Sequence, residues 1–75
     1  MRYNQYTDGE NIYYVSALYG SSIFAVCKKQ IGKRTFGIHK YKGRGNIPAD
    51  TPEAAQERLE ELAVKKGWQL FFDEV

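Results

Sequence analysis

Cysteine and histidine are almost absent from this 75-residue sequence, which contains one of each, Cys27 and His39. One cysteine cannot form an internal disulfide, and the two side chains together supply too few ligands for a structural zinc site. A catalytic histidine needs a nucleophile or an orienting acid nearby, yet residues 11–49 contain no Asp or Glu. We therefore expect an inert, buried Cys27, a structural or surface His39, no metal or cofactor, and no enzymatic activity.

Long apolar runs are also missing from the sequence. No stretch approaches the roughly 20 apolar residues with which a helix crosses a bilayer. The first ten residues are polar and show no signal-peptide pattern. Together with the lone cysteine, these absences indicate a reducing compartment, so we expect a cytoplasmic protein without a membrane partner.

The length of the chain limits it to one small domain without room for a deep catalytic cleft. We expect residues 1–10 to form a flexible N-terminus and residues 11–75 to form a single α+β domain. Three segments rich in β-branched and aromatic residues predict strands, at residues 12–19, 22–31 and 34–41. Gly20-Ser21 and Gly32-Lys33 fit two-residue turns between them, which predicts an antiparallel meander.

The segment "TPEAAQERLEELAVKKG" predicts a helix. Thr51 can cap its first amides, Pro52 suits its first turn, and Gly67 can end it in the left-handed conformation. The apolar stripe at i, i+4, i+7 and i+8 indicates one buried face. The segment "WQLFF", residues 68–72, predicts a fourth, C-terminal strand. The expected fold is β-β-β-α-β, with one helix packed on one face of the sheet.

The alternation of side chains divides the predicted sheet into two faces. One face is mostly aliphatic and contains Ile12, Tyr14, Ser16, Leu18, Ile23, Ala25, Cys27, Phe36 and Ile38. The other mixes aromatic and basic groups and contains Tyr13, Val15, Ala17, Tyr19, Phe24, Val26, Lys28, His39 and Tyr41. We expect the helix to cover the aliphatic face. The second face would then be partly exposed, which is typical of an interaction surface.

Positive charge is concentrated in the middle of the chain. Residues 11–49 hold seven Lys and Arg and no acid, whereas the flanks hold the other four and all nine Asp and Glu. Nucleic acids require cations for phosphates and, when single-stranded, flat rings for stacking. We therefore predict a small nucleic-acid-binding module, for DNA or RNA. Its candidate contacts are Tyr13, Phe24, Lys28, Lys33, Arg34, His39, Lys40, Tyr41, Lys42 and Arg44.

Two other interpretations stay open. The basic strands could simply be solvated edges that resist aggregation. The apolar C-terminal strand instead favours a protein-interaction module, such as a homodimer formed through the sheet or this strand, or a small regulator of a protein partner. From Tyr13 to Lys66 the order of elements also resembles, in outline, small three-stranded DNA-binding domains of some plant transcription factors and tyrosine recombinases. The resemblance includes no residue motif and assigns no residue roles.

Overall fold

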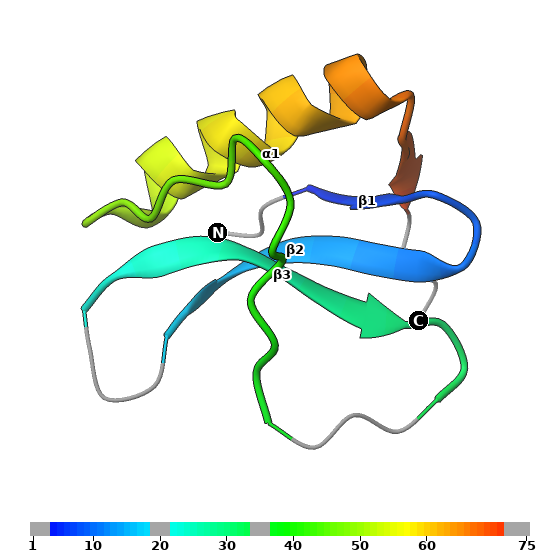
Figure 1. Ribbon diagram of the computed structural model, residues 1–75, viewed down its shortest axis with the longest axis horizontal. Coiled ribbons are helices and arrows are strands. Elements are labelled where there is room, and N and C mark those ends of the chain that lie inside the picture. The colour runs from blue at the N-terminus through cyan, green and yellow to red at the C-terminus, as the bar shows by residue number, and fades with distance from the viewer. Residues whose placement is uncertain (1–3, 19–21, 34–36, 72–75) are drawn as a thin grey trace.

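The computed structural model describes residues 4–18, 22–33 and 37–71, and every structural statement below concerns these residues. The described residues form one helix and a four-stranded sheet, and Figure 1 shows the helix lying across one face of the sheet. The elements in chain order are β1 (Gln5–Thr7), β2 (Asn11–Ala17), β3 (Phe24–Gln30), α1 (Pro52–Lys66) and β4 (Gln69–Phe71). The strands lie in the order β3-β2-β1-β4, and each neighbouring pair is antiparallel. The predicted β-β-β-α-β fold is confirmed.

The first strand, β1, lies in the segment for which the sequence analysis expected only a flexible N-terminus. Two features hold it in place. It is hydrogen-bonded between β2 and β4, and the Gln56 amide of α1 donates to the Asn4 carbonyl at 3.0 Å. Its three residues are too few and too polar to produce a clear strand pattern in the sequence.

The turn between β1 and β2 depends on Asp8. Its carboxylate accepts hydrogen bonds from the backbone amides of Glu10 at 2.9 Å and Asn11 at 2.8 Å, and from the Tyr13 hydroxyl at 2.7 Å. Gly9 takes a positive φ of 101°, which a residue with a side chain rarely adopts. Asp-Gly is a strong hairpin signal, and here it connects the strand that the sequence analysis missed to the next one.

The register of β2 and β3 gives the expected division into two faces. Tyr13 pairs with Lys28, Val15 with Val26, and Ala17 with Phe24, so these six side chains share one face. The predicted turn at Gly20-Ser21 lies outside the described residues.

The third predicted strand, residues 34–41, is not found as such. Residues 34–36 lie outside the described part of the chain, and residues 37–41 make only one isolated bridge, between Lys40 and Cys27. The turn after β3 is also one residue earlier than expected, because the Lys33 amide donates to the Gln30 carbonyl at 3.4 Å. Gly32 occupies the third position of that turn, with φ 75°.

The helix α1 begins and ends where the sequence predicts. The Thr51 hydroxyl accepts a hydrogen bond from the Ala54 amide at 3.2 Å, and Gly67 ends the helix with φ 76°. Its buried side comprises Ala55, Gln56, Leu59, Leu62 and Ala63. Within the described residues, no helix is both long enough and apolar enough to span a bilayer.

The helix covers the aromatic face of the sheet, so the predicted face was wrong. Tyr13, Val26, Leu59 and Leu62 form the core, and Tyr6, Val15, Tyr41 and Trp68 pack against it. The Trp68 ring stacks on Tyr13 at a centroid distance of 3.7 Å, and Tyr41 meets both rings edge-on at 5.3 and 5.6 Å. Large rings remove more apolar surface from water than aliphatic side chains of the other face would, which favours this arrangement.

Candidate functional site

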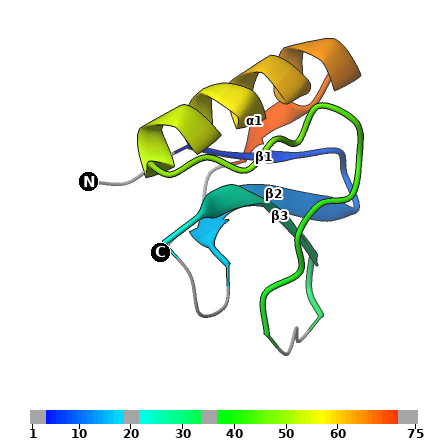
Figure 2. The ribbon, with the colours of Figure 1, turned by 60° about the vertical axis from the view of Figure 1, so that its left-hand side comes forward.

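The outer edge of β3 is covered by the chain that leads to the helix, which passes beside the sheet and up to the helix layer (Figure 2). At one end of this edge Phe24 and Ala49 exchange backbone hydrogen bonds of 2.7 and 2.8 Å. At the other end the Lys28 amide donates to the His39 carbonyl at 2.9 Å. Residues 39–49 therefore follow β3 without forming a regular strand.

The side chain of Asn46 replaces part of the missing backbone ladder. Its amide oxygen accepts from the Val26 amide at 3.1 Å, and its nitrogen donates to the carbonyls of Val26 at 3.0 Å and Tyr41 at 2.6 Å. Residues 42–45 can therefore form a short loop that leaves the β3 edge. A Cβ on Gly43 would lie 2.2 Å from the Tyr41 ring, so a larger residue at this position would require that ring to move.

A shallow depression of about 450 Å³ lies where β3 meets this segment, and we name it the basic groove. Its lining residues are Asn11, Lys28, Lys29, Gln30, His39, Lys40 and Lys42. Four lysines, one histidine and two amide side chains thus surround one space, and no carboxylate of the described residues lines it. Such a set attracts anions and offers them many hydrogen-bond donors.

Part of the predicted contact set is brought together in the basic groove. Lys28, His39, Lys40 and Lys42 all line it. Lys33 and Arg44 are exposed but lie outside its lining, and Arg34 lies outside the described residues. Lys29 lines the groove although the sequence analysis did not select it. The sequence signal that could have identified Lys29 was its position next to Lys28. Neighbouring residues of a strand point to opposite faces of the sheet, but a groove at the end of the strand can be lined by both.

The predicted aromatic residues do not form one exposed face, because Tyr13 is buried and Phe24 and Tyr41 are only partly exposed. Tyr13 is 4 % exposed beneath Trp68, and Tyr41 is half-buried against the same ring. Phe24 is also half-buried, and of the four predicted rings only that of His39 is on an exposed residue. The expectation of an exposed aromatic face at these positions was wrong because the helix covers that face.

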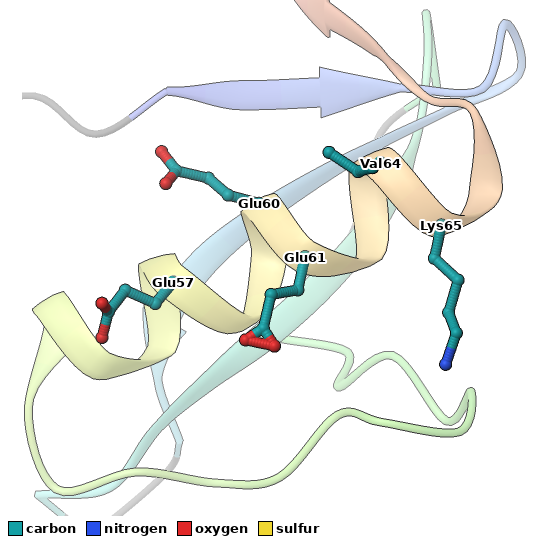
Figure 3. Close-up of a pocket in the computed structure, with 5 residues that line it drawn as sticks. All are labelled: Glu57, Glu60, Glu61, Val64 and Lys65. Atoms are coloured by element: carbon teal, nitrogen blue, oxygen red, sulfur yellow. The ribbon is translucent and has the colours of Figure 1, made fainter.

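Negative charge lies on the outer side of α1. Figure 3 shows Glu57, Glu60 and Glu61 projecting from the helix, around a shallow depression that Val64 and Lys65 also line. These carboxylates are exposed, and none of them lines the basic groove. A polyanion is therefore repelled by the outer helix surface and attracted at the groove.

The perturbed titratable groups have structural causes. Burial raises the pKa of the Tyr13 hydroxyl, and its hydrogen bond to the Asp8 carboxylate raises it further. For Asp8, partial burial opposes ionisation, but the hydrogen bonds it accepts outweigh this and lower its pKa to about 2. Burial raises the pKa of the Cys27 thiol. Within the described residues, no group of three or more His, Cys, Asp or Glu side chains could hold a metal ion.

No protein-family model matches the chain, and no curated protein or solved structure matches it. The functional argument accordingly rests on the geometry and charge of the basic groove.

Proposed function

We propose that this protein binds nucleic acid by holding phosphate groups in the basic groove. The observation that carries the proposal is the lining of the groove, in which the described residues contribute four lysines and a histidine and no carboxylate. The side chains of Asn11 and Gln30 add neutral amide donors, which can also form hydrogen bonds with phosphate oxygens.

The shape of the groove supports a chain-like ligand over a small one. It is shallow and open along the end of the sheet, and Lys28, Lys40 and Lys42 on it are exposed. A polymer of phosphates can contact several such cations in succession and release counterions from each contact. Because the carboxylates on the outer side of α1 repel a polyanion, we expect a polyanion to approach the molecule at the basic groove.

A salt titration tests this proposal. We expect labelled oligonucleotides to bind in fluorescence anisotropy, with affinity falling roughly 100-fold between 50 and 200 mM salt if four phosphates are contacted. The double variant Lys40→Gln, Lys42→Gln should weaken binding and lower the salt slope by about two. The matched control, Lys65→Gln with Lys66→Gln, removes the same charge from the helix end. Equal losses in both variants would leave only non-specific attraction and overturn the proposal.

A protein interface at β4 is the second candidate. β4 is an edge strand of the sheet, and within the described residues its outer side pairs with no other strand. Its Leu70 is 38 % exposed, and the described strand carries no charge that would discourage edge-to-edge pairing. Light scattering would show a dimer that persists in high salt and dissociates in Leu70→Lys. A monomer at all concentrations would remove this candidate.

A further inference from the structure

The sheet has a second face, turned away from the helix, which we name the open face. Residues that alternate with the core residues point to it. In the strand register Phe71 pairs with Gln5, and Tyr14 pairs with Cys27, whose other neighbour is Lys40. Gln5 alternates with Tyr6, which pairs with the core residue Tyr13, so Gln5 and its partner Phe71 point away from the helix. The rings of Tyr14 and Phe71 therefore share the open face with Lys40, which also lines the groove.

The geometry points to single-stranded nucleic acid as the ligand, and this inference rests on the proposed function. We propose that bases stack on Tyr14 and Phe71 of the open face, while the backbone continues into the basic groove past Lys29 and Lys40. Base stacking on aromatic side chains, combined with lysines along the backbone, is a common physical basis for binding unpaired strands.

The rings of Tyr14 and Phe71 are both partly exposed to solvent. Tyr14 and Phe71 are half-buried, in contrast to Tyr13 directly beneath the helix. The Lys29 ammonium lies 5.2 Å from the centroid of the Tyr14 ring. Because Lys29 also lines the basic groove, this contact links Tyr14 of the open face directly to the groove.

On β2 the open face is closed at Ile12, which is only 7 % exposed, so its usable part comprises Tyr14 of β2 together with β1 and β4. Over β3 it is closed, since Ala25 and Cys27 are completely buried. Charge favours the same ligand, because none of the four strands contains Asp or Glu. A polyanion lying across this surface thus meets lysines and no carboxylates of the sheet.

The spacing of the rings distinguishes single strands from duplexes. Tyr14 and Phe71 are separated by the strand β1, which places them about 10 Å apart at ordinary strand spacing. Bases in a duplex are paired and stacked on each other inside the helix, so rings on a flat sheet reach them only after costly unstacking. An unpaired strand can turn successive bases toward both rings.

The test compares three labelled probes of one length: a single strand, the corresponding duplex, and an abasic strand that keeps its phosphates. We expect the single strand to bind best. Tyr14→Leu and Phe71→Leu should each weaken it by about tenfold or more and leave its salt slope unchanged. Tyr14→Phe keeps the ring and should retain binding. The abasic probe should bind weakly and respond to neither Leu variant, and thermal melts of each variant confirm folding.

The outcomes separate the two proposals. If duplex and single strand bind equally, or if the folded Leu variants bind the single strand normally, the stacking inference fails while phosphate binding stands. If no probe binds even at low salt, the proposed function itself fails. A loss restricted to the single strand, with Lys40→Gln and Lys42→Gln affecting all three probes, would support both.

Discussion

Tyr13 and Tyr14 are neighbours in β2 with identical side chains, yet they occupy opposite faces of the sheet and different surroundings. Tyr13 lies under the helix, stacked on Trp68 and hydrogen-bonded to Asp8. Tyr14 lies on the open face beside the Lys29 ammonium. The comparison shows that residue type does not decide which ring is buried in the core and which keeps exposed surface. The position of the helix decides it.

The sheet edges differ in a similar way. The β3 edge is covered by a segment that supplies backbone bridges and the Asn46 side chain. The β4 edge has no partner strand within the described residues. Positive charge gathers at the covered edge and exposed Leu70 at the other, so each edge supports a different kind of contact.

Replacing each tyrosine in turn should give the largest contrast between the faces. Tyr13→Ala should lower the free energy of unfolding by about 3–5 kcal/mol, because it removes a buried ring from the core. Tyr14→Ala should lower it by about 1 kcal/mol and act mainly on nucleic-acid binding. Urea unfolding measures both. Equal losses of stability would show that the open face is also a packed core.

Removing the side chain of Asn46 should have the next largest effect. Asn46→Ala leaves hydrogen-bonding groups of Val26 and Tyr41 without their side-chain partner, which we expect to cost about 2–3 kcal/mol. Chemical denaturation of the variant checks this value, with Asn4→Ala as a control asparagine outside the segment. A loss no greater than the control would mean that the β3 edge is held by its backbone bridges alone.

Acid should weaken the β1–β2 turn. The pKa of Asp8 is lowered from 3.8 to about 2, so the folded state holds its proton less tightly than the unfolded chain does. Its contribution is complete above pH 3.8 and disappears as the pH falls toward 2. Asp8→Asn should lower stability at pH 7 by about 1 kcal/mol and flatten the acid side of the melting-temperature profile. An unchanged acid profile in the variant would assign the acid sensitivity to other carboxyls.

The smallest expected effect concerns Cys27, which lies on the open face but is completely buried. Burial raises the pKa of its thiol, so the nucleophilic thiolate is scarce in the folded protein. We expect iodoacetamide to leave the native protein unmodified at pH 8 and to alkylate it after unfolding in urea. Mass spectrometry distinguishes the two. Rapid alkylation of the native protein would show that the open face extends over β3.

Local signals in the sequence predicted the helix and the register of β2 with β3. Thr51, Pro52 and Gly67 mark the helix ends without reference to the rest of the chain, and the alternation of β2 and β3 sorts their side chains into two sets. The strand β1 was missed because three polar residues have no periodicity to detect. Its place between β2 and β4 comes from long-range pairing, which local patterns do not contain.

The candidate site was predicted in part, for a related reason. Its cations follow from charge clustering, and Lys28, Lys40 and Lys42 do meet in one groove. The choice of exposed rings depended on the face that the helix covers. Which face the helix covers depends on the total apolar area that each of the two packings buries. Trp68 contributes the largest ring to the observed packing, but the sequence alone does not show which packing buries more.

The acidic side of α1 and the basic groove are separate parts of the described surface, so their opposite charges form an electric dipole that the net charge of +2 does not describe. A dipole experiences torque in the field of a charged polymer before any contact is made. Under the proposed function, the field of a nucleic acid would turn the groove forward during diffusion, so a larger share of collisions would begin in a productive orientation. Dissolved salt shortens the reach of this rotation to about a Debye length, which slows association before it loosens the bound complex.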